Sequence, residues 1–251
     1  MKKVIFNADD YGYSQGINKG IVEASNNGVV RSTTMMANMP GFDHGVSLLP
    51  TAKNLKVGVH LCLTTGKSLG GVYKTLTDEN GSFLSLTQVI QNAKDGKIDL
   101  SEVEAEYTLQ IEKIINAGIK PTHFDGHHHS QNLNGVVDVF LKLAKKYNVA
   151  VRIEEPSKLS GEYANIKTTS FDASFFGDNV TQNQIDTILS TSTDHINNTI
   201  EVMCHPGYAD DFVMSSSSYN KTRETELEIL TNHQIKELIQ QKGYALSDFC
   251  L

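Results

Sequence analysis

A segment in the middle of the chain, residues 123–129, carries four imidazoles and one carboxylate in the order His-Phe-Asp-Gly-His-His-His. These side chains are metal ligands, and they are seldom this dense without a shared partner. A histidine-rich expression tag would lie at a terminus, but this tract follows Lys120-Pro121-Thr122 in mid-chain. We interpret it as part of a metal site in which at most two or three of the histidines contact the ion.

Three other polar groups follow, or interrupt, apolar segments that are typical of buried strands: Asp9-Asp10, His60 and His205. Carboxyl ends of parallel strands converge on one face, so these groups and the tract could meet around one ion. Two adjacent carboxylates resist joint ionisation. A divalent cation would relieve this for one of them and leave the other as a base near a metal-bound water. His205 could then protonate a leaving group.

Each of these groups also has a structural alternative. Asp9-Asp10 could form a turn or a helix cap, His60 could be a hydrogen-bonded core histidine, and His205 could cap local carbonyls. Arg152 is expected either to orient a catalytic carboxylate or to pair with Glu154 or Glu155 at the surface. A donor set of one carboxylate and two imidazoles suits Zn, Mn or Fe(II), and suits Mg less naturally.

The elements that must position these groups alternate between strand and helix about seven times, which suits a complete or distorted (β/α) barrel. The pattern predicts strands at 3–7, 33–38, 57–63, 122–126, 149–153, 168–171, 198–204 and 244–249. It predicts helices at 14–27, 42–49, 86–92, 102–117, 134–147, 182–190, 222–230 and 233–241. Residues 64–84 have no clear period and are expected to be either a substrate lid or a flexible loop, and residues 215–218 a mobile loop.

Composition limits the classes of partner. The 251 residues have no linker-like stretch, which predicts a single domain over 1–251. The net charge is -7 with scattered Lys and Arg, so a nucleic-acid surface is not expected and a small or uncharged ligand is. Without a membrane-length apolar run or a signal peptide, we expect no membrane partner and a cytoplasmic location.

Cysteine and aromatic usage add two further limits. Cys62, Cys204 and Cys250 are odd in number and lack metal-type spacing, so they are expected to be small buried or terminal residues without a disulfide framework. Trp is absent, which weakens the case for a sugar platform built on indole rings. The Tyr and Phe residues could take that role.

Four motifs occur in the order known from one family: Asn-Ala-Asp-Asp-Tyr-Gly at 7–12, Gly-Val-His-Leu at 58–61, Thr-His-Phe-Asp-Gly-His-His-His at 122–129 and Glu-Val-Met-Cys-His-Pro at 201–206. In these motifs, and over essentially its whole length, the chain resembles the YdjC-like (ChbG-type) carbohydrate deacetylases. The resemblance implies a distorted (β/α) TIM-like barrel related to the polysaccharide deacetylases. It also implies a homodimer that removes acetate from N-acetylglucosamine units of chitin-derived oligosaccharides, such as diacetylchitobiose and 6-phosphorylated forms.

By motif position, the resemblance implies that Asp10, His60 and His127 hold a divalent metal ion, Mg or Zn. Asp9 would be the general base and His205 the acid. Contacts to the substrate or to these ligands would come from Asp125, His128, His129 and Arg152, whereas His123 would be structural. The family often continues the triple histidine with a further His after one residue; here Ser130-Gln131 follows, so an outer sugar contact is expected to differ.

Other functions stay open at this point. One is a metal-dependent sugar-binding protein without catalysis, and another is a metal hydrolase acting on a disaccharide phosphate. Cleavage of a glycosidic bond fits less well, because the adjacent Asp9 and Asp10 do not resemble two carboxyls placed across a bond.

Overall fold

The computed structural model describes residues 1–191 and 195–250. The chain divides into two compact units. Unit 1 comprises residues 1–34, 40–57 and 169–251, and unit 2 comprises residues 35–39 and 58–168. The single domain expected over residues 1–251 stays a prediction.

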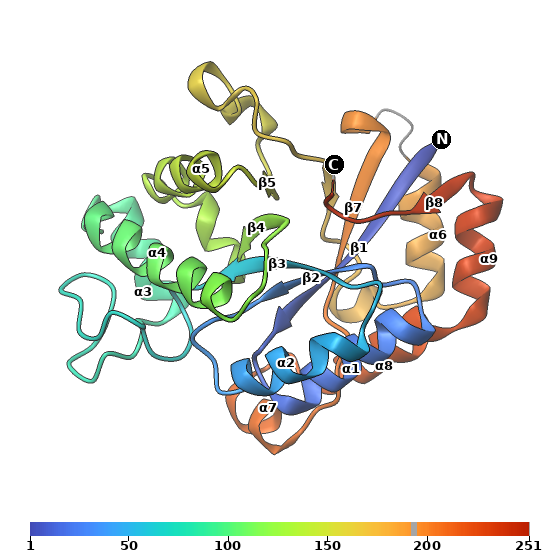
Figure 1. Cartoon of the computed structure of the whole chain (residues 1–251), viewed down its shortest axis with the longest axis horizontal. Coiled ribbons are helices and arrows are strands. Elements are labelled where there is room, and N and C mark those ends of the chain that lie inside the picture. Colours follow the sequence, from blue (N-terminus) through green and yellow to red (C-terminus); the bar gives the residue numbers. More distant parts are fainter. Residues whose placement is uncertain (192–194, 251) are drawn as a thin grey trace. The chain divides into compact units, whose positions relative to one another are not determined.

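Unit 1 is built on a buried first strand, β1, which pairs in parallel with β7 and, through its first residues, with β8 (Figure 1). The strand order in this unit is β2-β1-β7-β6. The bounds are Lys2–Tyr11 for β1, Ser32–Met35 for β2, Ser170–Asp172 for β6, Thr199–Cys204 for β7 and Tyr244–Leu246 for β8. The register pairs Ala8 with Cys204. Asp9, the residue after Ala8 in β1, and His205, the residue after β7, therefore lie at the same end of two neighbouring strands.

The helices of unit 1 begin and end close to the predicted positions, with one exception. Ser14 caps α1 by accepting from the Ile17 N–H, as its place before the apolar pattern predicts. The exception is α7, which begins after the cap Asp210, so the loop predicted at 215–218 is wrong for Ser215 and Ser216. The bounds are Gln15–Asn27 for α1, Phe42–Leu48 for α2, Gln182–Thr191 for α6, Asp211–Ser216 for α7, Thr222–Thr231 for α8 and His233–Gln241 for α9.

Unit 2 contains three parallel strands in the order β5-β4-β3. The register of β3 and β4 places His60 beside Asp125. The unit has the strands β3, Lys56–Leu61 (from Gly58 onward in this unit), β4, His123–Gly126, and β5, Ala150–Val151. Its helices are α3, Leu86–Lys94, α4, Leu100–Asn116, and α5, Val136–Tyr147, and the short 3-10 helix η2 at His127–Asn132 follows β4.

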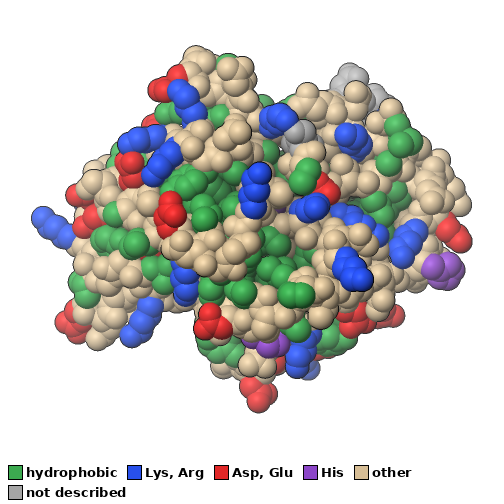
Figure 2. Space-filling view, viewed as in Figure 1, with side chains coloured by type: hydrophobic (Ala, Val, Ile, Leu, Met, Phe, Trp, Pro, Cys, Tyr) green, Lys and Arg blue, Asp and Glu red, His purple; other side chains and the backbone are tan. Residues whose placement is uncertain are grey.

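Burial explains why apolar runs form these strands. In unit 1, Val4, Ile5 and Phe6 are fully buried, as are Val59 and Phe124 in unit 2. Such continuous apolar runs are typical of parallel strands covered on both faces. In the described part of the chain, no helix combines the length and the apolar character needed to span a bilayer. On the face shown in Figure 2, Lys and Arg are interspersed with Asp and Glu.

The three cysteines are buried or near the end of the chain, as the sequence predicts. The Cys62 and Cys204 side chains are buried, and Cys250 is exposed. The Cys62 thiol donates to the Thr65 carbonyl and the Cys204 thiol to the Asn7 carbonyl, each at 3.3 Å. The two buried cysteines therefore act as small core residues.

Candidate active site

Asp9 and Asp10 lie near the end of β1, and both carboxylates are buried. The Asn7 amide donates to Asp9 Oδ1 at 2.8 Å, and Arg223 of α8 donates to Asp10 Oδ2 at 2.7 Å. These partners lower the cost of burying two adjacent acids. Asp10 has a φ of 71°, in the left-handed region that is costly for a residue with a side chain and recurs at functional sites. The helix-capping role belongs to Ser14.

His205 directly follows β7 and is held by a buried acid. Its backbone N–H donates to Glu226 Oε2, and its Nδ1 lies 3.9 Å from Glu226 Oε1. The ring of Tyr219 stacks on Phe176 with centroids 4.2 Å apart, and both rings lie edge-on to the imidazole. The His205 side chain is 12% exposed. The imidazole therefore touches solvent while its other sides contact an acid and two aromatic rings.

The loop that carries His205 packs closely on α1. A Cβ added at Gly20 would lie 2.5 Å from Gly207 Cα, closer than real Cβ contacts. The Tyr208 N–H donates to the Gly16 carbonyl at 3.2 Å. Both glycines on α1 are therefore part of what positions His205.

In unit 2, His60 is oriented by a chain of buried polar contacts. Its Nδ1 lies 2.7 Å from Asp125 Oδ1, and Arg152 Nη1 lies 3.1 Å from Asp125 Oδ2. All three side chains are at most 2% exposed. A carboxylate beside Nδ1 accepts the Nδ1–H, and in that tautomer the lone pair is on Nε2. Arg152 thus pairs with Asp125, and its side chain is buried instead of lying at the surface.

His127 follows β4 and meets His60. Its Nδ1 lies 3.3 Å from His60 Nε2, and the two rings meet edge to face with centroids 5.3 Å apart. Nitrogen ligands of one divalent ion, each about 2.0–2.1 Å from it, lie roughly 3–3.4 Å apart. The two imidazoles therefore fit a shared ion.

The other histidines of the tract have separate surroundings. His128 Nδ1 lies 2.9 Å from the Thr64 hydroxyl, and His129 Nδ1 lies 3.1 Å from Glu154 Oε1. Both residues have positive φ, 56° and 54°, which bends the chain directly after His127. His123 is fully buried, and a Cβ added at Gly58 would lie 2.5 Å from its ring. This close packing agrees with the structural role expected for His123.

Each unit supplies buried candidates for metal ligands: the Asp10 carboxylate in unit 1, and the His60 and His127 imidazoles in unit 2. A carboxylate and two imidazoles are a donor set that divalent metals accept. The protein therefore has buried acidic and imidazole groups that could bind a metal ion.

The 64–84 loop, the irregular segment before α3, is fastened to α4 by two carboxylates one turn apart. Glu106 is fully buried and accepts from the backbone N–H groups of Leu69 and Gly70 at 3.0–3.1 Å. Glu102 accepts from the Thr75 N–H at 2.9 Å and from its hydroxyl at 2.6 Å. The middle of this loop is therefore held by charge-assisted hydrogen bonds, which argues against a lid that opens along its whole length.

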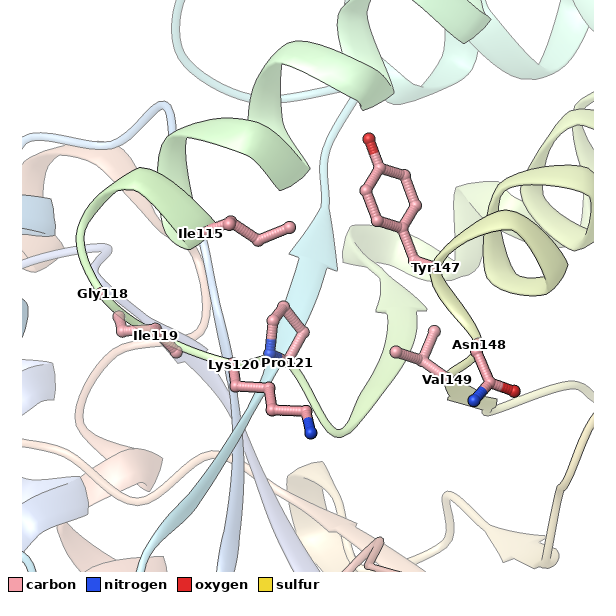
Figure 3. Close-up of a pocket in the computed structure, with 8 residues that line it drawn as sticks. All are labelled: Ile115, Gly118, Ile119, Lys120, Pro121, Tyr147, Asn148 and Val149. Carbon is pink, nitrogen blue, oxygen red and sulfur yellow. The ribbon is translucent and has the colours of Figure 1, made fainter.

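A pocket of about 450 Å³ lies elsewhere in unit 2, where the chain enters β4 and β5 (Figure 3). Ile115, Pro121 and Val149 line it together with Lys120. Its lining residues include no carboxylate and no imidazole. The polar groups described above follow the carboxyl ends of the strands, so this pocket is a separate feature.

Arg223 and Glu226 were not predicted from the sequence. Both lie on α8 and are buried together with Leu227 and Leu230, on the same stripe of the helix. Charged residues at positions i and i+3 of an apolar stripe are the signal that could have identified them, because buried charges need partners. Asn7, which holds Asp9, was missed as well.

Comparison with known proteins identifies relatives over nearly the whole chain. The model of the family described as YdjC-like protein matches residues 3–241. A carbohydrate deacetylase of Clostridium beijerinckii is 40% identical over 98% of both chains. Carbohydrate deacetylase 1 of Listeria innocua is also 40% identical, again over 98% of both chains.

Two solved structures show the fold. A protein of Enterococcus faecalis V583 described as a cellobiose-phosphate cleavage protein superposes with a TM-score of 0.88 at 31% identity, covering 99% of this chain and 97% of its own. A family 4 carbohydrate esterase of Streptomyces lividans superposes with a TM-score of 0.54 at 14% identity, covering 98% and 92%. The predicted fold class, an α/β fold with a distorted TIM-like barrel, is confirmed.

Proposed function

The chain belongs to the family of YdjC-like proteins, and we propose that it removes the acetyl group from N-acetylglucosamine units of chitooligosaccharides such as diacetylchitobiose, 6-phosphorylated forms included. The enzyme class, a carbohydrate deacetylase, rests on relatives that are 35% to 40% identical over nearly their full length. The choice of sugar is the finer part of the proposal. It rests on the resemblance of the four ordered motifs.

Metal dependence is carried by one observation: Asp125 fixes His60 so that its Nε2 faces His127 Nδ1 at 3.3 Å. We propose Asp10, His60 and His127 as the ligands of one divalent ion, Mg or Zn, of which the two nitrogen donors favour Zn. When bound, the ion supplies a Lewis acid that polarises the acetamide carbonyl and lowers the pKa of water. Asp125 and Arg152 keep His60 in the ligating tautomer.

Two residues of this chain each carry out one proton transfer. Asp9 takes the proton of the attacking water as a general base, with Asn7 fixing its carboxylate. His205 gives a proton to the sugar nitrogen as the amide C–N bond breaks, so that the amine leaves in neutral form. His128 and His129 are proposed to contact the sugar or to support the ligand His127. A homodimer and a cytoplasmic location complete the proposal; light scattering and cell fractionation test them.

The deciding experiment is an acetate-release assay over a panel of N-acetylated sugars, with the metal content measured on the same sample. Acetate release that disappears with chelator and returns with one divalent ion supports the proposal. Metal-loaded protein that binds chitooligosaccharide without releasing acetate would instead be a sugar-binding protein. Release of phosphate from a disaccharide phosphate, or cleavage of cellobiose phosphate, would replace the deacetylase with a different hydrolase.

A further inference from the structure

Glu226 is a fully buried carboxyl group in α8 that faces His205. Its Oε2 accepts from the His205 backbone N–H, and its Oε1 accepts from the Tyr219 hydroxyl and lies 3.9 Å from His205 Nδ1. Arg223, one turn earlier on α8, donates through Nη2 to Asp10 and through Nε to the Tyr219 carbonyl. Both oxygens of Glu226 are thus directed to His205 and to the aromatic ring beside it.

The surroundings of Glu226 shift the pKa of its carboxyl in opposite directions. Burial raises the pKa of the Glu226 carboxyl to about 8, and the charge of Asp9 adds to this rise. The hydrogen bonds from the His205 N–H and the Tyr219 hydroxyl, and the charge of Arg223, act to lower the pKa. A carboxyl group in this balance exchanges its proton near neutral pH.

We propose that Glu226 is a positioning residue for His205, which holds the His205 backbone in place and whose ionisation is coupled to that of the imidazole 3.9 Å away. The inference rests on the proposed function, in which His205 is the acid. In a buried pair of this kind the proton belongs to both groups, and the pair titrates as a unit. A net-neutral pair is favoured by burial, whether the proton lies on the carboxyl or on the ring.

This arrangement matters for catalysis because an acid must be protonated at the working pH. An isolated imidazole loses its proton near pH 6.5. The carboxylate of Glu226 offsets the positive charge of the imidazolium, so the pair keeps its proton to higher pH. His205 can then act as an acid at neutral pH.

The test uses Glu226→Gln, which is isosteric with the native residue but cannot ionise. The pH dependence of kcat/KM is measured on the metal-loaded enzyme, and the pKa of His205 is measured by NMR of labelled imidazole, assigned with His205→Asn. We expect Glu226→Gln to move both the basic limb of kcat/KM and the His205 pKa down by about one pH unit or more. A His205 pKa that stays within about 0.3 of the wild-type value overturns the inference.

Tyr219→Phe provides a second variant with the opposite expectation. It removes a hydrogen bond that favours the ionised carboxylate, so the pair should keep its proton to higher pH and the basic limb should move up. If the basic limb of kcat/KM moves in the same direction in Tyr219→Phe and in Glu226→Gln, the proposed coupling between Glu226 and His205 is contradicted.

The matched control is Glu228→Gln, which removes the same charge from an exposed position two residues away on α8. It should leave the pH dependence of kcat/KM and the NMR titration of His205 unchanged. A shift equal to that of Glu226→Gln would mean that the change in net charge alone causes the shift. Because the NMR titration needs no substrate, it decides the Glu226–His205 pair even if no sugar is deacetylated. Failure of the proposed function and failure of this inference are therefore distinguishable.

Discussion

Arg152 Nη1 lies 3.1 Å from Asp125 Oδ2, and the other oxygen of that carboxylate lies 2.7 Å from His60 Nδ1. The Arg152 and Asp125 side chains are fully buried, so each depends on the other for its charge. Asp125 links a structural ion pair to a proposed metal ligand. Two predictions follow from its two contacts.

Asp125→Asn should weaken metal binding about 10- to 100-fold, because the amide can no longer hold His60 in one tautomer with the strength of a carboxylate. Competition titration of metal-stripped protein against a chelator measures the affinity. The control is Asp138→Asn on the exposed side of α5, which should bind metal as the wild type does. Unchanged affinity in Asp125→Asn would remove His60 from the proposed ligand set.

Arg152→Met should lower the free energy of unfolding by about 3–5 kcal/mol, because it leaves the Asp125 carboxylate buried without its cation. Urea unfolding of metal-free protein measures this loss. The double variant with Asp125→Asn should recover part of the loss, since the uncompensated charge is gone. If the two losses simply add, the ion pair is not what makes Arg152 important.

Most elements could be predicted because their signals are local. Apolar runs predicted β1, β3 and β7, and the N-cap residue Ser14 predicted the start of α1. The strand expected at 149–153 is only Ala150–Val151, because apolar character does not tell how far pairing with a neighbour extends. Helix α7 was missed since its six residues are too short to show a period.

The residues of the candidate site could likewise be predicted only where their signals are local. Asp9, Asp10, His60, His127 and His205 were identified from residue type and strand position, and their roles remain predictions. The apolar stripe of α8 could have indicated that Arg223 is buried and needs a partner. That this partner is Asp10 could not be predicted, because the two residues are more than 200 positions apart in the sequence. Only the pairing of segments in the fold brings such groups together.

Asp9→Asn should keep metal affinity within about twofold while lowering kcat/KM by about 10²- to 10⁴-fold, because an amide cannot accept the water's proton. Asp10→Asn is the companion variant, and it should lose metal as well as activity. Acetate release and metal content on the same samples separate the two results. An Asp9→Asn enzyme that works at the wild-type rate refutes the base assignment.

Glu106→Ala should free the centre of the 64–84 loop, because three backbone and side-chain donors lose their acceptor. The expected cost is about 1–3 kcal/mol, with faster hydrogen exchange at Leu69 and Gly70. Glu104→Ala on the same helix removes an exposed pair with Lys142 and should cost less than about 1 kcal/mol. Equal exchange in the two variants would show that Glu106 does not hold the loop.

Glu226 should also make stability depend on pH. Its pKa is raised to about 8 in the folded state, and the proton that it keeps there belongs to the pair with His205. The unfolded chain has lost the protons of both groups above about pH 6.5, so between about pH 6.5 and 8 the folded chain keeps one proton that the unfolded chain has released. Stability contributed by the protonated pair is complete below this window and is lost as the pH rises through it. The loss should be on the order of a few kcal/mol.

Urea unfolding at pH 5, 6, 7 and 8 checks this dependence. The stability of Glu226→Gln relative to the wild type should rise across the series, whereas that of Glu228→Gln should stay level. A flat difference for Glu226→Gln would mean that the carboxyl is ionised in the folded protein throughout.

The order of segments in unit 1 has a consequence for synthesis on the ribosome. The strand β1 has β2 as an early neighbour, complete at Met35, but its other neighbour, β7, begins only at Thr199, and β8 follows at Tyr244. At about 5–20 residues per second, the apolar Val4-Ile5-Phe6 segment waits roughly 10–40 s for β7. A nascent chain of this protein therefore leaves the β7 edge of a hydrophobic strand unpaired until β7 has been translated, and it is at this stage that a chaperone would have most to protect.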